Sequence, residues 1–135
     1  ELRKAGNEFG ATTGRPRRCG WIDLVALNYA CMINGVTKVV MTKADVLDKF
    51  TPLQVCTAYN VNGVETDQIP FDICKANIEP VLKSFPGWNT DTTVCKTEND
   101  LPETMRTYIQ FINEKIGAPV KWVSNGPGRD QIVPL

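Results

Sequence analysis

Hydrophobic positions divide the chain into segments with different periodicities. Residues 21–33 are apolar on most faces, which predicts a helix buried between layers, closed by the left-handed cap that Asn34-Gly35 favours. Residues 36–41 end in a continuous apolar run, typical of a buried parallel strand. A short helix is expected over residues 46–50. This first third of the chain therefore alternates helix and strand.

Alternating apolar and polar positions over 53–61 predict a strand, and Asn62-Gly63 is the dipeptide that would return 64–68 as the second arm of a hairpin. A further strand is expected over 78–85, where an internal proline places part of it at a sheet edge. The middle of the chain thus predicts an antiparallel appendage.

A second helix is expected after Asn99 or Asp100, either of which can cap it. Its buried face would be formed by apolar residues at helical spacing, namely Met105, Tyr108, Ile109, Ile112 and Ile116. Residues 120–123 predict a short strand, and a loop follows at 124–128. The mixture of elements indicates a layered α/β architecture with the antiparallel hairpin attached to it.

Composition narrows the function classes. The 135 residues suit one domain, and 15 basic residues balance 15 acidic ones, which argues against general nucleic-acid binding. No apolar run is long enough for a membrane span, and no signal-peptide pattern opens the chain. The chain begins at Glu1 without a methionine, so we interpret it as a piece of a longer polypeptide.

Cysteine and histidine usage bears on the chemistry. Five cysteines without a C-x-x-C pair predict reduced thiols in a cytoplasmic protein rather than a disulfide framework or a zinc site. Cys31 and Cys56 lie in apolar runs typical of core positions. Histidine, the commonest general base at neutral pH, is absent. These two cysteines are therefore expected to be core thiols rather than nucleophiles, since no histidine exists to activate them.

The stretch from Gly10 to Arg18 has the composition of an anion clamp, since it combines two glycines, two threonines and three arginines. Guanidinium forks match carboxylate and phosphate edges, and threonine hydroxyls add neutral donors. The N–H groups at the start of the following helix would lie close to the same spot. A solvated basic loop or a nucleic-acid patch is the alternative interpretation.

Two further loops follow predicted strands, where open α/β sheets hold ligands. Asp45, in Thr42-Lys43-Ala44-Asp45, could accept hydrogen bonds from the N1–H and amine of guanine; a helix capping box is the alternative. Ser124-Asn125-Gly126 could meet the O6 of the same purine, although a plain turn explains it equally well. The three loops predict a specific ligand site only if they converge at one edge of the sheet.

The run from Asn7 to Arg18, followed by Gly20-Trp21, resembles the substrate loop of the adenylosuccinate synthetase family. The motifs 42–48, 56–59, 86–88 and 124–127 recur in that family's order. The resemblance covers the whole chain and about the last third of the family's polypeptide. It implies the C-terminal part of a P-loop-NTPase-like layered α/β fold with a mainly parallel sheet, residues 1–135 being a fragment of one larger domain.

The resemblance also implies an activity. The family is a cytoplasmic, homodimeric ligase of purine biosynthesis, which makes adenylosuccinate, GDP and phosphate from IMP, L-aspartate and GTP in the presence of Mg²⁺. GTP phosphorylates the purine 6-oxygen, and the aspartate amine then displaces phosphate from C6. The family's Gly-rich phosphate loop, Mg²⁺ ligands and catalytic Asp and His would lie upstream of this chain, so the chain alone is expected to be inactive.

Carried onto matching positions, the resemblance implies specific contacts. The aspartate loop would comprise Ala11, Thr12, Thr13, Gly14, Arg15, Pro16 and Arg17. Both threonines would bind the aspartate carboxylates, Arg15 would reach aspartate and the IMP ribose, and Arg17 would link aspartate to GTP. The guanine would be held by Lys43, Ala44, Asp45, Ser124, Asn125 and Gly126. Asn125 replaces the family's usual Thr, and Ala44 a frequent Leu.

Two alternatives to the enzyme stay open on the residues alone. One is a non-catalytic guanine-nucleotide or anion-binding module, in which the arginine loop docks a phosphate or an acidic partner. The other is an RNA-binding loop, whose binding would depend steeply on salt; the balanced charge disfavours it.

Overall fold

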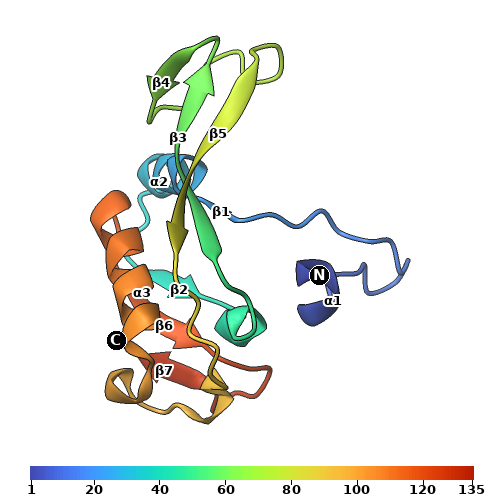
Figure 1. Ribbon diagram of the computed structural model, residues 1–135, viewed down its shortest axis with the longest axis vertical. Coiled ribbons are helices and arrows are strands. Elements are labelled where there is room, and N and C mark those ends of the chain that lie inside the picture. The colour runs from blue at the N-terminus through green and yellow to red at the C-terminus, as the bar shows by residue number, and fades with distance from the viewer.

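The computed structural model describes all residues from 1 to 135 and contains two small sheets, three α-helices and three 3-10 turns (Figure 1). The α-helices are α1 Leu2–Ala5, α2 Leu24–Ile33 and α3 Glu103–Lys115. The strands are β1 Ile22–Asp23, β2 Val39–Met41, β3 Leu53–Val61, β4 Val64–Thr66, β5 Ile78–Phe85, β6 Val120–Ser124 and β7 Ile132–Pro134. The 3-10 turns are η1 Ala44–Leu47, η2 Thr92–Val94 and η3 Glu98–Asp100. The expected α/β class is confirmed.

Strand pairing differs between the two sheets and within each. In the first, β3 pairs in parallel with β1 and antiparallel with β4 and β5; in the second, β6 pairs in parallel with β2 and antiparallel with β7. A mainly parallel sheet was expected, whereas pairing within this chain is mixed. Short connections such as the β3–β4 turn cannot make the crossover that parallel neighbours require.

The register between β2 and β6 positions two loops of interest. Val39 lies opposite Val120, the register then shifts, and Met41 lies opposite Val123. Both strands run in the same direction, so the loops that follow Met41 and Ser124 leave the sheet at one edge. The 3-10 turn η1 begins directly there, two residues earlier than the short helix expected from sequence, and β6 packs against it.

Helix α2 begins at Leu24, three residues later than expected, because Ile22 and Asp23 pair with β3 as strand β1. The Asp23 side chain caps the helix by accepting from the Ala26 N–H at 3.0 Å, and it also accepts from the Tyr59 hydroxyl at 2.5 Å. The helix N-terminus is therefore occupied by a carboxylate of the chain itself. One pocket is nevertheless lined both by Leu27 of α2 and by Arg17 and Arg18 of the arginine loop.

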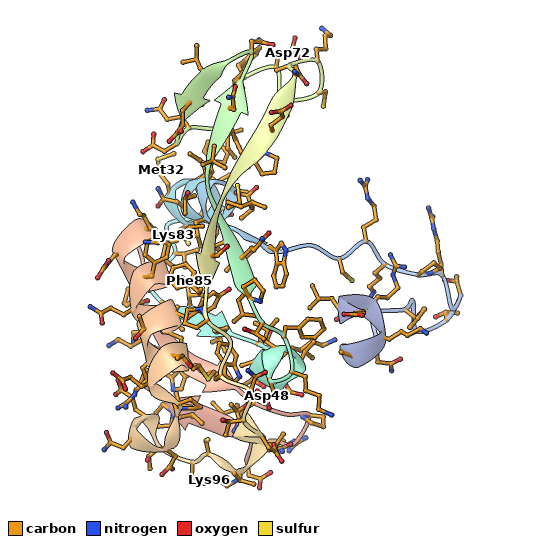
Figure 2. The ribbon with its side chains drawn as sticks, in the orientation of Figure 1. Met32, Asp48, Asp72, Lys83, Phe85 and Lys96 are labelled. Atoms are coloured by element: carbon orange, nitrogen blue, oxygen red, sulfur yellow. The ribbon has the colours of Figure 1, made fainter.

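Only one side of α2 is covered. Leu24, Val25 and Cys31 are buried, whereas Met32 and Ile33 are 69% and 60% exposed. Figure 2 shows Met32 at the outer surface of the helix. The apolar sequence of α2 suggested burial between two layers, and in this structure one of those layers is present.

The hairpin is confirmed at its predicted residues. Asn62 and Gly63 both take positive φ angles, 53° and 90°, as the tight two-residue turn requires. Strand β5 pairs only with β3 and places Pro80 opposite Tyr59, which confirms the predicted sheet edge. This three-stranded arm projects from the rest of the molecule (Figure 1).

Helix α3 supplies one wall of the main core through Met105, Tyr108, Ile109 and Ile112, as the spacing predicted. Its first residue is preceded by Pro102, with no side-chain cap, while Asp100 caps η3 instead. The predicted Asp100 or Asn99 cap on α3 is therefore wrong. None of the helices has the length and apolar character needed to cross a bilayer.

The turn after η1 is anchored by Asp48, which is nearly buried. Its carboxylate accepts from the Trp88 indole N–H at 2.7 Å and from the Thr92 N–H and hydroxyl, both at 2.8 Å. Figure 2 marks Asp48 beside this turn. Gly87 lies so close to the same turn that a Cβ there would stand 2.0 Å from the Phe50 oxygen. The segment 86–92 is thus locked against η1.

Candidate anion and nucleotide site

The arginine loop stands apart from the two sheets, and every residue from 11 to 20 is exposed (Figure 1). Its base is closed by a bridge between Phe9 and Pro16 and by the Gly10 N–H, which donates to the Arg15 oxygen at 2.9 Å. Gly14 adopts φ 63° and donates to the Gly10 oxygen at 2.9 Å. The backbone is therefore a tied turn that leaves its side chains in solvent.

Glu8 joins this loop to the loop after β2. Its carboxylate pairs with the Arg17 guanidinium at 3.0 Å through one oxygen and with the Lys43 ammonium through the other. Lys43 also donates to the Gly6 oxygen at 2.9 Å. The pKa of Glu8 is lowered by these two cations, with Lys43 the larger cause and Arg17 the next. One carboxylate therefore joins Arg17 and Lys43, which are 26 positions apart in the sequence.

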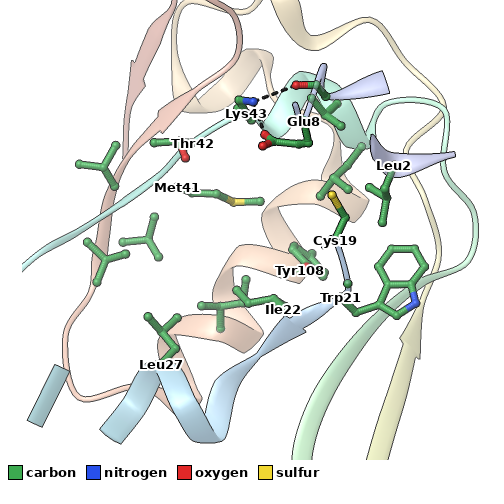
Figure 3. A pocket seen from close by; sticks show the side chains of 18 of the residues that line it. Leu2, Glu8, Cys19, Trp21, Ile22, Leu27, Met41, Thr42, Lys43 and Tyr108 are labelled. Atoms are coloured by element: carbon green, nitrogen blue, oxygen red, sulfur yellow. Dashed lines mark hydrogen bonds and ion pairs between the residues drawn. The ribbon is translucent and has the colours of Figure 1, made fainter. Parts of the chain in front are cut away.

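A pocket of about 580 Å³ opens beneath this charged group (Figure 3). Glu8, Arg17 and Lys43 belong to its lining, and most of the remainder is apolar. Figure 3 shows Met41, Ile22, Leu27, Tyr108 and Trp21 among the wall residues. The cavity is therefore apolar inside and charged at one side.

The loop after β2 offers a free acceptor. Lys43 takes φ 58° ahead of η1, and no side chain caps this turn. The capping box between Thr42 and Asp45 is therefore wrong for this structure. One carboxylate oxygen of Asp45, Oδ1, is buried without a hydrogen-bond partner. A buried oxygen without a partner is costly, so this carboxylate is left with an unmet acceptor.

The loop after β6 is closed by its own hydrogen bonds. The Ser124 hydroxyl donates to the Gly126 oxygen at 3.2 Å, and the Asn125 N–H donates to the Gln131 oxygen at 3.1 Å. The Asn125 amide is fully buried and donates to the oxygens of Thr92 and Cys95. In this structure the side chain of Asn125 anchors the loop.

The three predicted loops are thus brought together to different extents. Arg17 and Lys43 share Glu8, while Asp45 and Ser124 follow neighbouring parallel strands at one sheet edge. The tip of the arginine loop stands away from both, and Arg15 makes no ion pair.

Sequence reasoning missed two of the carboxylates that matter here. Glu8 lies two residues before Gly10 and is an acidic residue beside a cluster of arginines in a chain without net charge, which was a usable signal. Asp48 had no such signal, because its partners Trp88 and Thr92 lie at least 40 positions away.

Three of the five cysteines, Cys31, Cys56 and Cys95, are buried, whereas Cys19 and Cys74 are exposed. Cys31 and Cys56 are buried, as predicted for core thiols. Burial raises the pKa of the Cys56 thiol and, at another buried position, that of Cys95. A raised pKa disfavours the thiolate, which is the nucleophilic form. These cysteines act as packing residues.

Fold and site together define a mixed α/β protein that gathers cations and a free carboxylate at the ends of parallel strands, the place where such sheets hold anionic and nucleotide ligands. A family model described as adenylosuccinate synthetase matches residues 1–133. The chain belongs to the adenylosuccinate synthetase family.

Individual relatives agree with this assignment. The adenylosuccinate synthetases of Parabacteroides distasonis and Cytophaga hutchinsonii are each 52% identical, over 98% and 97% of this chain, and 31% of each relative is covered. A solved structure of fully ligated adenylosuccinate synthetase from Plasmodium falciparum superposes with a TM-score of 0.92 at 34% identity, over 99% of this chain and 33% of that one. The chain spans about a third of the length of these relatives.

Proposed function

We propose that this chain forms the aspartate-binding and guanine-binding part of an adenylosuccinate synthetase. The complete enzyme joins IMP and L-aspartate at the expense of GTP, with adenylosuccinate, GDP and phosphate as products. The observation that carries the proposal is the buried oxygen of Asp45, which lacks a partner in the strand-end loop of a chain that belongs to this family. We further propose that the enzyme is cytoplasmic and homodimeric.

The arginine loop is proposed to bind L-aspartate. Its residues, Ala11 to Arg17, are exposed and surround a tied turn, and the side chains of Thr12, Thr13 and Arg15 donate no hydrogen bond within the chain, so these donors are free for a ligand. Thr12 and Thr13 would donate to the two carboxylates, and Arg15 would reach both aspartate and the IMP ribose. Arg17 stands next to Lys43 through Glu8, which supports a role for its guanidinium between aspartate and GTP.

The two strand-end loops are proposed to bind the guanine of GTP. Asp45 would accept from the ring N1–H and the exocyclic amine, while the stem of Lys43 covers the base. Ala44 is fully buried and fixes the turn between them. Ser124 and Gly126 would complete the pocket on the side of the purine oxygen, with Asn125 holding their loop in place through its buried amide.

The reaction requires two bond exchanges. The 6-oxygen of IMP attacks the γ-phosphorus of GTP, and GDP leaves; the aspartate amine then forms the C6–N bond while phosphate leaves with the oxygen. The contribution of this chain is to orient aspartate by its carboxylates, so that the amine points at C6, and to offset negative charge with guanidinium groups.

The family uses Mg²⁺, which proteins usually hold through one or two carboxylates together with substrate phosphates. No group of three or more His, Cys, Asp or Glu side chains is placed to hold a metal ion. We therefore propose that the metal and the groups that move protons are held by other parts of the complete enzyme.

The function is tested by assaying the complete enzyme for adenylosuccinate formation that depends on IMP, L-aspartate and GTP together. Residues 1–135 expressed alone are expected to form no product, because they cover only a third of the relatives' length. No product from the complete enzyme at saturating substrates would reject the ligase, and GTP binding without turnover would favour a non-catalytic module instead.

A further inference from the structure

Glu8 has no role in the function proposed above, yet it is the residue through which the two loops meet. We propose that Glu8 is a positioning residue that couples the aspartate loop to the guanine loop by holding Arg17 and Lys43 in one ion-paired unit. The inference rests on the proposed function, since it takes Arg17 to contact aspartate and GTP and Lys43 to contact guanine.

Glu8 is the most sheltered of the three side chains in the ion-paired unit. The Glu8 side chain is 22% exposed, whereas those of Arg17 and Lys43 are 57% and 53% exposed. The carboxylate is therefore the sheltered member, and the two cations extend from it into solvent. Each of its oxygens serves one cation, so neither cation displaces the other.

The backbone around Glu8 is also fixed. The Glu8 N–H donates to the Arg3 oxygen at 2.9 Å, and the Arg17 N–H donates to the Glu8 oxygen at 3.0 Å. The Arg3 guanidinium in turn donates to the Arg17 oxygen at 2.6 Å. Glu8 and Arg17 are thus tied through both backbone and side chain.

The ion pairs leave N–H donors of Arg17 and Lys43 free for ligands. Arg17 uses one guanidinium nitrogen, Nη1, for Glu8, which leaves the rest of its fork for a carboxylate or phosphate. Lys43 uses its ammonium for Glu8 and the Gly6 oxygen and retains one further N–H. Two cations and one carboxylate carry a net positive charge, which suits anionic substrates.

The consequence is reciprocal coupling between two ligands. Without the carboxylate, Arg17 and Lys43 would repel each other, and the two loops would no longer be held in place relative to each other. A ligand that orders one cation also orders Glu8 and therefore the second cation. Coupled sites must influence each other equally in binding free energy.

The test begins with the complete enzyme that carries this segment. If the unaltered enzyme makes no adenylosuccinate, the proposed function fails, and that failure is distinct from any result on Glu8. In the active enzyme, Glu8→Gln is expected to raise KM for aspartate and KM for GTP by about three- to tenfold, as for residues in one ion-paired network. KM for IMP is expected to change less, because neither Arg17 nor Lys43 is assigned to IMP and only Arg15 of the same loop is.

The matched control is Glu65→Gln on β4, which also removes one carboxylate, here an exposed one that lies in no ion pair. It should leave all three KM values and the Tm unchanged. The Tm of Glu8→Gln should also stay within about 2 °C of the unaltered enzyme, since exposed ion pairs add little stability. Equal losses for all three substrates together with a lowered Tm would overturn the coupling role in favour of a structural one.

A double-substitution experiment separates coupling from simple contact. Lys43→Met should raise KM for aspartate when Glu8 is present and leave it unchanged in the Glu8→Gln background, because the effect reaches Arg17 through the carboxylate. Additive effects of the two substitutions would overturn the proposal. Glu8→Asp, which keeps the charge on a shorter stem, should restore part of the loss. If Glu8→Gln does not fold, Lys43→Met alone decides: an unaltered KM for aspartate would equally overturn the proposal.

Discussion

Two aspartates three positions apart illustrate how environment assigns a residue its task. The carboxylate of Asp48 accepts three hydrogen bonds, from Trp88 and Thr92, and is fully engaged in the fold. Asp45 lies in the same short turn but keeps a buried oxygen without a donor. The same side chain is therefore fully hydrogen-bonded at one position and left with an unmet acceptor at the other.

The carboxylate of Asp45 makes a prediction about nucleotide choice. Asp45→Asn in the complete enzyme should lower the preference for GTP over ITP, which lacks the exocyclic amine, by about 10- to 100-fold in the ratio of kcat/KM values. A hydrogen bond to a charged group contributes about 1.5–3 kcal/mol, and each 1.4 kcal/mol is about tenfold. Steady-state kinetics with both nucleotides measure the ratio, and an unaltered ratio would exclude Asp45 from base recognition.

The charge state of Glu8 makes a prediction about pH. Its pKa is lowered first by Lys43 and then by Arg17, so the ion pairs stabilise the loops above the ordinary pKa of a glutamate and are lost as pH falls through the lowered value. Lys43→Met removes the larger cause and should move the pKa back upward. An NMR titration of the Glu8 carboxyl carbon measures this change; an identical titration in both proteins would show that the pair is absent in solution.

At the scale of elements, sequence pattern predicted those features that depend on neighbouring residues in the chain. The Asn62-Gly63 hairpin, the edge strand β5 and the buried face of α3 were all predicted from periodicity and turn residues. The start of α2 was missed, because Ile22 and Asp23 become a strand only through pairing with β3. Pairing between segments distant in sequence leaves no periodic signal in either one.

The junction between η1 and η2 makes a prediction about stability. Asp48→Ala removes the acceptor of three hydrogen bonds and leaves buried donors unsatisfied, so it should lower the free energy of unfolding by about 3 kcal/mol or more. The control Thr92→Val removes only the hydroxyl of this group and should cost about 1 kcal/mol. Urea unfolding of both variants measures the difference. Equal costs would contradict a central role for Asp48.

At the scale of the whole molecule, the sequence predicted which loops follow neighbouring strands better than how distant side chains meet around them. Parallel strands explain why Asp45 and Ser124 share one edge, which the strand order allowed in advance. The burial of the Asn125 amide and the bridge through Glu8 depend on side chains from distant segments meeting in three dimensions. Such meetings are fixed by the fold and cannot be predicted from spacing along one chain.

The exposed apolar surface makes a prediction about residues 1–135 in isolation. Met32 and Ile33 on α2 leave an apolar surface uncovered, and such surfaces bind hydrophobic dyes and promote association. Isolated 1–135 should increase the fluorescence of an anilinonaphthalene dye, and Met32→Gln combined with Ile33→Gln should reduce that increase by about half. The control is Lys38→Gln in the exposed loop before β2. A signal that does not respond to the double substitution would place the dye elsewhere.

The register shift between β2 and β6 affects how well the protein tolerates insertions and deletions in this strand. Val39 faces Val120, but Val40 faces Trp122, so Lys121 is a supernumerary residue without a counterpart on β2. Without this extra residue, Trp122 instead of Val123 would lie opposite Met41. Successive side chains point to opposite faces of a sheet, so the side chain of Ser124 would then point to the other face, relative to Lys43. Single-residue length changes in this strand should therefore be far less tolerated than substitutions at the same position.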